Sequence, residues 1–208
     1  MICYASNTGT KRNLAALHTA GWRIMLSPNN CRLPTGFKFA IDNGAWSCFQ
    51  QKLPFDTAGF TTLCDLHGAA ADFVVVPDIV AGGQESLDFS KQWLNRLQHF
   101  RLILLAVQDG MKPDDVGVLL ERYSNLGIFL GGSTEWKLRT LYGWGMVAHA
   151  MRCWFHVGRV NTARRMRLCQ EAGATSVDGT SASMYASTLP LLQATQKQPS
   201  LLTPKLLG

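Results

Sequence analysis

Eight short apolar runs, most of them separated by segments of helical character, constrain the fold of this chain more than any other feature. The runs cover residues 2–5, 23–27, 37–41, 73–77, 102–107, 127–130, 153–157 and 175–177. Strands that alternate with helices are typical of a parallel sheet covered by helices, and eight such units close a barrel. We therefore predict a compact (β/α)8 barrel, or TIM barrel, of the α/β class.

Six of the intervening segments have the spacing or the start signals of helices. They cover residues 11–20, 55–66, 86–98, 113–123, 134–150 and 161–172. The segment after the second run, residues 28–35, is too short and too rich in proline for a helix, so we expect a degenerate unit there. The 208 residues are expected to form a single domain, with fraying from about residue 190 in a tail that carries Pro199 and Pro204.

Composition supports a folded core and argues against a disordered chain and a membrane-spanning protein. Apolar residues make up 47% of the chain and charged residues 16%, which is a globular rather than a disordered mixture. No apolar run approaches the roughly 20 residues that span a bilayer, and the first residues do not resemble a secretory signal. The six cysteines are not spaced as metal ligands, so we expect reduced cysteines, no bound metal and a cytoplasmic location.

The positive charge is concentrated in one stretch. Seven Lys and Arg residues and a single Glu lie between Glu135 and Gln170, so this stretch accounts for the whole net charge of +6. A localised basic face is typical of a surface that binds a polyanion, although it can also be a solvated surface without a ligand.

Polar residues gather at the points where the predicted strands end. In a barrel of this kind, chemistry takes place at the C-terminal ends of the strands. Each such residue has an ordinary explanation by itself, such as a helix cap, a tight turn or packing. Their convergence on one rim indicates an active site. The segments are Asp42 to Trp46, Pro77-Asp78, Gln108-Asp109-Gly110, Gly131-Gly132-Ser133, His156 to Arg159, and Asp178 to Ser181.

Three carboxylates at one mouth, with an amide and a glycine pair, suit the cleavage of an N-glycosidic bond. One carboxylate can stabilise or capture the oxocarbenium-like sugar, and a second can move the proton of the base. A purine edge offers donors and acceptors that Asp, Gln and backbone N–H groups can match. The chain lacks the GxGxxG, Walker A and HExxH motifs, so nothing in the spacing indicates nucleotide-driven or zinc-protease chemistry.

The motifs DNGAW, VVVPD, AVQDG, FLGGSTEW, HVGR and SVDGTS, in this order between Ile41 and Ser183, resemble those of tRNA-guanine transglycosylases. They are still more similar to those of DpdA-type 7-deazaguanine DNA transglycosylases of phages and bacterial modification islands. The resemblance implies a glycosyltransferase that exchanges guanine for a 7-deazaguanine through a covalent intermediate. Asp178 matches the nucleophile that attacks C1′ of the sugar, and Asp42 matches the second catalytic Asp, a general acid/base.

The resemblance also implies residues that hold the substrates. Asp78 and Gln108 match the residues that read the base edge, and the backbone of Gly131 and Gly132 is expected to lie against the base. Trp46 is expected to stack on the base. We expect His156 and Arg159 to contact the sugar or a phosphate. Backbone phosphates would be held by the basic stretch, which contributes Lys137, Arg139, Arg164, Arg165 and Arg167.

Three departures from the tRNA enzymes favour DNA as the acceptor. The chain lacks a CxCxxC…H zinc module, is much shorter, and continues after Asp178 as GTSAS rather than with a PTR segment. We therefore expect guanine-containing DNA with a flipped base and a free 7-deazaguanine, in its 7-cyano form, as partners, with no cofactor. The setting would be the host cytoplasm if the chain is phage-encoded, and a homodimer or an accessory protein stays open.

Three other functions remain as alternatives. The same exchange could act on tRNA. An N-glycosidase or nucleoside hydrolase would use water as the acceptor. A nucleic-acid-binding barrel without catalytic activity would keep the basic face and need neither Asp42 nor Asp178.

Overall fold

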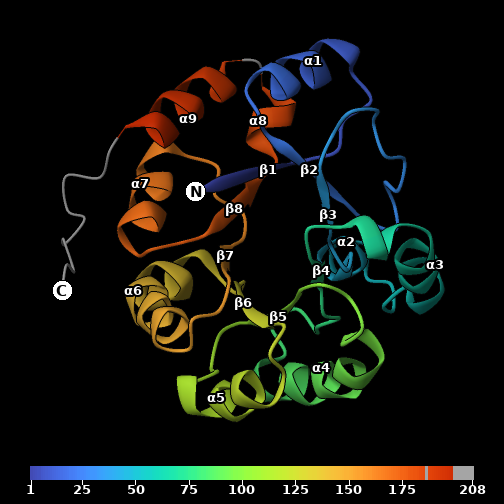
Figure 1. The fold of residues 1–208 in the computed structure, drawn as a ribbon, viewed down its shortest axis with the longest axis vertical. Coiled ribbons are helices and arrows are strands. Elements are labelled where there is room, and N and C mark those ends of the chain that lie inside the picture. Colours follow the sequence, from blue (N-terminus) through green and yellow to red (C-terminus); the bar gives the residue numbers. More distant parts are fainter. Residues whose placement is uncertain (186, 199–208) are drawn as a thin grey trace.

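The computed structural model describes residues 1–185 and 187–198, which form a closed barrel of eight parallel strands (Figure 1). Each strand pairs with the next along the chain, and the last pairs with the first, as in Cys3 beside Val177. The predicted (β/α)8 barrel is confirmed, and every strand ends within two residues of its predicted ends. The strands are β1 (Ile2–Ser6), β2 (Arg23–Leu26), β3 (Phe39–Ile41), β4 (Val74–Val75), β5 (Ile103–Val107), β6 (Leu126–Leu130), β7 (Phe155–Val157) and β8 (Ser176–Gly179).

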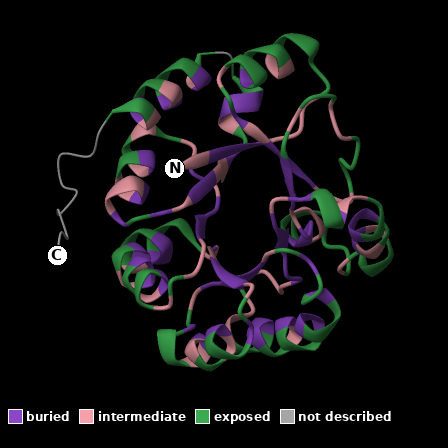
Figure 2. Cartoon of the chain, in the orientation of Figure 1, coloured by how far each residue is buried: buried purple, intermediate pink, exposed green. Residues whose placement is uncertain are grey.

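Helices surround the ring of strands and turn their buried sides toward it (Figure 2). Residues 27–38, which connect β2 to β3, contain no helix, so the predicted degenerate unit is confirmed. The six predicted helices are α1 (Lys11–Thr19), α3 (Thr57–His67), α4 (Gly83–Leu97), α5 (Pro113–Arg122), α6 (Thr134–Ala150) and α7 (Ala163–Glu171), and a short 3-10 turn, η1 (Gly68–Ala70), follows α3.

An additional short helix, α2 (Ala45–Gln51), follows β3 and was not predicted. The chain turns into it at Gly44, whose φ of 79° lies in the left-handed region. A side chain at this position would also place its Cβ 2.9 Å from Cδ of Pro28. The Asn43 side chain accepts a hydrogen bond from the Ala45 backbone at 2.9 Å and so stabilises the first turn.

The C-terminal part of the described chain is more regular than the sequence suggests. After α8 (Ser181–Met184), the helix α9 (Thr188–Lys197) runs through the region where fraying was expected. It buries Leu189 and Leu192, and this burial outweighs the weak helical signal of the segment. The prolines expected to loosen the tail, Pro199 and Pro204, lie outside the described residues.

The N-terminal end of the barrel interior is packed and closed. Alternate strand residues point inward, and an apolar cluster that includes Tyr4, Phe73 and Leu104 fills the axis. The Tyr4 hydroxyl donates to Asp72 at 2.9 Å, and Asp72 also pairs with Arg23 at 2.8 Å. Because this end is filled, a ligand can enter the barrel from the C-terminal end.

Three of the six cysteines, Cys3, Cys64 and Cys169, are buried as small apolar side chains, and the others are partly or fully exposed. All six are free thiols. In the part of the chain that the structure describes, no helix combines the length and the apolar character needed to cross a membrane.

Candidate active site

A hollow of about 740 Å³ opens at the C-terminal mouth of the barrel. Its floor is formed by inward residues of the strands, such as Met25 and Phe129, and its walls by the loops that follow them. A second hollow, of about 850 Å³, lies near the C-terminal ends of α6 and α7, at the other end of the barrel. We place the candidate site at the mouth, because it contains the carboxylates and because barrel enzymes work at this end.

Asp42 and Asp178, the two predicted catalytic residues, both line the hollow at the mouth. Asp42 directly follows β3 and Asp178 lies in β8, so strands from different parts of the ring bring the two side chains to one cavity. The pKa of Asp42 is raised to about 7, first by burial and then by the negative charges of Asp178 and Asp78. Asp42 can therefore either hold or release a proton near neutral pH.

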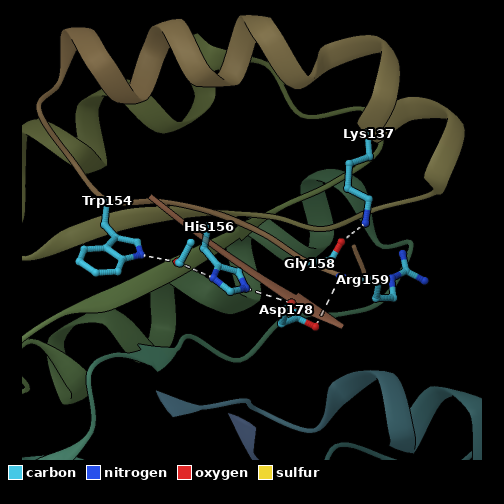
Figure 3. A network of polar contacts seen from close by, with 7 residues as sticks. Lys137, Trp154, His156, Gly158, Arg159 and Asp178 are labelled. Carbon is cyan, nitrogen blue, oxygen red and sulfur yellow. Dashed lines mark hydrogen bonds and ion pairs between the residues drawn. The ribbon is translucent and has the colours of Figure 1, made fainter. Parts of the chain in front are cut away.

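Asp178 receives hydrogen bonds on both carboxylate oxygens (Figure 3). Nε2 of His156 lies 2.9 Å from Oδ1, and the backbone N–H of Arg159 donates to Oδ2 over a longer distance of 3.4 Å. The side chain keeps 16% of its surface exposed. Asp178 is thus a supported carboxylate that still faces the cavity.

His156 does not contact the sugar or a phosphate, because its side chain is fully buried beneath Asp178. Its position in the centre of β7 places it inside the barrel, where it stacks on Phe129 at a centroid distance of 4.8 Å. Its other nitrogen, Nδ1, lies 2.7 Å from Oγ of Ser176, which also accepts a hydrogen bond from Nε1 of Trp154 at 2.7 Å. The expectation of a direct substrate contact for His156 is wrong.

Gln108 and Asp78 take part in a hydrogen-bond network behind Asp42 and do not line the hollow. Gln108 is buried, and its Nε2 donates to Asp78 at 3.1 Å and to Ser86 at 2.7 Å. Asn43 donates to the other oxygen of Asp78 at 2.7 Å. Burial raises the pKa of Asp78 to about 6. The structure gives these residues a role in holding the Asp42 loop, and the expected reading of a base edge is not available to Gln108 in this arrangement.

Trp46 and Arg159 line the hollow together, and the expected contacts of Trp46 with a base and of Arg159 with a sugar or phosphate stay predictions. The guanidinium of Arg159 lies 4.4 Å from the centre of the Trp46 ring and also donates to the carbonyl of Gly132. Trp46 is 40% exposed on α2. The pair joins the loops after β3, β6 and β7 across one side of the mouth.

Gly131 and Gly132 lie outside the lining of the hollow and form the turn after β6. Gly132 has a φ of 73°, and a Cβ there would lie 2.5 Å from Oδ2 of Asp109. Asp109 in turn accepts from the backbone and the hydroxyl of Ser133, both at 2.6 Å, and so fixes the start of α6. The glycine pair is explained by this turn, and the expected contact with a base stays a prediction.

The basic stretch divides into a buried and an exposed part. Lys137 is buried and donates to the carbonyl of Gly158, so the expected phosphate contact is wrong for this residue (Figure 3). Burial and the neighbouring charge of Arg159 lower its pKa to about 8. The other members lie at the surface or partly exposed on α6 and α7, where they can meet a phosphate: Arg139, Arg164, Arg165 and Arg167.

Several amide side chains of the hollow were missed by the sequence analysis. Asn7 follows β1, Asn30 follows β2, and Asn161 follows β7. Asn7 and Asn30 bind one another through a 2.9 Å hydrogen bond, and Asn161 accepts from the backbone of Ser181 at 3.0 Å. The sequence does carry a signal for Asn7 and Asn30, because both are polar residues that come after the first two strands, at the end of the barrel that forms the mouth.

Comparisons with known proteins leave the site to be interpreted from its own chemistry. Neither a scan against models of protein families nor a search of curated proteins finds a match to this chain. Within the two described ranges, no three His, Cys, Asp or Glu side chains gather closely enough to hold a metal ion. The fold and the mouth therefore define a (β/α)8 barrel with two carboxylates on one cavity.

Proposed function

We propose that this protein is a DNA-guanine transglycosylase, which exchanges guanine in DNA for a 7-deazaguanine, most simply the 7-cyano form. The observation that carries the proposal is the pair Asp42 and Asp178 on one hollow of about 740 Å³, where the pKa of Asp42 is raised to about 7 and both oxygens of Asp178 receive hydrogen bonds. Double displacement at a sugar carbon requires such a pair, one carboxylate as nucleophile and one as acid/base.

In the first step, Oδ2 of Asp178 attacks C1′ and the bond from C1′ to N9 of guanine breaks. The electron pair of that bond goes to guanine, which takes a proton from the carboxyl of Asp42. In the second step, the incoming 7-deazaguanine attacks C1′, Asp42 takes its proton, and Asp178 leaves as a carboxylate. Each step inverts C1′, so the product keeps the original configuration. The raised pKa of Asp42, about 7, suits both of its roles at neutral pH.

The surroundings of the hollow support a nucleic acid as the acceptor. Arg164 and Arg165 lie in the first turn of α7, which follows the β7 strand end at the mouth. Arginines in this place can hold the phosphates beside a flipped nucleotide. A cytoplasmic location belongs to the same proposal, because DNA and free base are available there and the free cysteines fit a reducing compartment.

Incubation with duplex DNA and labelled 7-cyano-7-deazaguanine tests the proposal, followed by digestion and detection of the modified nucleoside. We expect label in DNA with wild-type protein and with Asp88→Asn, a control that removes a surface carboxylate on α4. We expect none with Asp178→Ala. Absence of label from DNA with the wild-type protein would overturn the proposal.

Two parallel reactions and one binding measurement separate the alternatives. With tRNA in place of DNA, incorporation would assign the same chemistry to tRNA. If guanine is released as fast without added base as in the full reaction, the protein is an N-glycosidase that uses water. DNA binding that survives loss of both Asp42 and Asp178, with no turnover in any reaction, would indicate a binding barrel.

A further inference from the structure

A chain of hydrogen bonds runs from the barrel interior to Asp178. Trp154, His156 and Asp178 follow one another in Figure 3, and Ser176 lies between the first two, with both of its contacts at 2.7 Å. The strands impose this order. Trp154 and His156 are two residues apart and point inward, as do Ser176 and Asp178, and the register pairs His156 with Ser176.

The donors and acceptors of this chain determine where the proton of His156 lies. The indole N–H of Trp154 can donate and cannot accept, so Oγ of Ser176 is the acceptor there. The Ser176 hydroxyl is fully buried, and its own hydrogen has one other polar partner among the described residues, Nδ1 of His156. Nδ1 must then accept, which leaves the proton of the neutral ring on Nε2, where it faces Oδ1 of Asp178 at 2.9 Å.

The ring cannot turn away from this arrangement. Phe129 stacks on it at 4.8 Å, and the rings of Phe73 and Tyr4 meet it edge-on at 5.2 and 5.9 Å. These apolar neighbours offer no other hydrogen-bond partner of carboxylate strength. The His156 side chain is therefore held as a fixed donor directed at one oxygen of Asp178.

We propose that His156 and Ser176 are positioning residues that select the attacking oxygen of Asp178. The neutral His156 ring binds Oδ1 through Nε2–H, and Oδ2, whose own contact is the longer 3.4 Å bond from the Arg159 backbone, is the oxygen that attacks C1′. This inference rests on the function proposed above and adds the device that prepares its nucleophile. The same donor stabilises Asp178 when it leaves as a carboxylate in the second step, since a hydrogen bond to the charged oxygen is strongest at that point. Neither His156 nor Ser176 lines the hollow, so neither touches the base.

The first test reads the proton directly and does not require activity. Two-bond ¹⁵N–¹H correlation spectra of histidine-labelled protein distinguish the two neutral ring forms from the charged one. We expect His156 at neutral pH with its proton on Nε2, identified among the five histidines by its loss in His156→Gln. Ser176→Ala should shift the same signals, which provides a second identification. A proton on Nδ1, or a charged ring, in the wild-type protein would overturn the inference. The proposed exchange reaction does not depend on this result.

The second test uses the exchange reaction. His156→Phe keeps an aromatic ring among Phe129, Phe73 and Tyr4 but removes the donor, and we expect kcat to fall roughly 10- to 100-fold, as for a lost hydrogen bond to a charged group. KM for the free base should stay within about twofold of wild type, because His156 does not contact the base. His156→Gln, which can still donate to Asp178, should recover part of the loss.

Ser176→Ala should reduce kcat less, by roughly 3- to 10-fold, because the donor remains but its proton is no longer fixed on Nε2. Thr195→Val is the matched control, since it removes a buried hydroxyl on α9 that donates to the backbone of Leu191, away from the mouth. An unchanged kcat in both His156→Phe and Ser176→Ala would contradict the positioning role. If wild-type protein shows no exchange at all, the proposed function fails, and the spectra still decide the state of His156.

Discussion

The two carboxylates of the mouth, Asp42 after β3 and Asp178 in β8, have contrasting surroundings. Asp42 lies near two other carboxylates and is partly buried, so its pKa rises to about 7. Asp178 has donors directed at both oxygens, one of them from the buried His156. Residues of one type thus acquire different chemistry from their neighbours alone, which is how acid and base roles are commonly divided in enzymes.

The hydrogen-bond networks behind Asp42 and Asp178 also differ. Behind Asp42, the amides of Asn43 and Gln108 are used to satisfy another carboxylate, Asp78. Behind Asp178, the interior chain of Trp154, Ser176 and His156 ends on the carboxylate of Asp178 itself. On the β7–β8 side, hydrogen-bond donors are thus directed at the carboxylate of the mouth, whereas on the β3–β5 side burial and the neighbouring carboxylates raise the pKa of Asp42.

Replacement of the supported carboxylate should have the largest effect. Asp178→Asn keeps the shape and can still accept from His156, but the amide cannot form the sugar ester. We expect exchange to fall by about 10⁴-fold or more, the scale of losing a nucleophile, while DNA affinity stays near wild type. The modified nucleoside and DNA binding are measured on the same preparation. Retention of more than a tenth of the activity would contradict the division of roles.

Replacement of the proton-holding carboxylate should have a smaller effect on the rate. Asp42→Asn removes the acid/base but leaves the nucleophile, and we expect exchange to fall about 10²- to 10⁴-fold. Single-turnover measurements should show a slower release of guanine in the first step. An equal loss in both variants would indicate that the two carboxylates act as one unit.

The same variant should change the dependence of stability on pH. Because folding raises the pKa of Asp42 from about 4 to about 7, the folded protein binds more protons than the unfolded chain in this interval. The free energy of unfolding should therefore fall as pH rises from 4 to 7, by up to about 1.4 kcal/mol for each step of one in pH. Urea unfolding at several pH values should show a shallower decline in Asp42→Asn, with the remainder from Asp78, whose pKa is raised to about 6.

The smallest effect concerns the basic stretch that borders the Asp178 side. Arg164→Gln removes an exposed charge, and the slope of log affinity for DNA against log salt should become less steep by about 0.9 if one phosphate contact is lost. Lys137→Met should leave this slope unchanged, because Lys137 is buried against Gly158. Binding titrations at three or more salt concentrations make the measurement. A reduced slope in Lys137→Met would show that this lysine reaches the nucleic acid.

Much of the barrel could be predicted because its signals are local. Alternation of apolar runs and helical segments indicated all eight strands and the missing helix after β2. The helix α2 could not be predicted in this way, since it is seven residues long, exposes Trp46 and Phe49, and begins at a left-handed glycine. The helix α9 was also missed, because its stability comes from packing its buried leucines rather than from its own sequence.

The candidate site was predicted in part. Asp178 lies near the end of β8, Asp42, Trp46 and Arg159 come after strand ends, and all four line the hollow. The same rule placed His156 at the mouth, although it lies one step deeper inside the barrel. Position along the barrel axis depends on how the strands are staggered, and that stagger follows from closing the ring rather than from any one segment.

Local sequence patterns were enough to predict the order of strands and helices, the end of the barrel that carries the polar groups, and the concentration of positive charge in one stretch. These follow from periodicity and composition, which each segment possesses before it meets another. Three contacts became visible only in the folded barrel: His156 binds Asp178, Lys137 is buried against Gly158, and Gln108 donates to Asp78. Such pairings depend on register between strands distant in the chain, because hydrogen bonds require atoms to meet within about 3 Å.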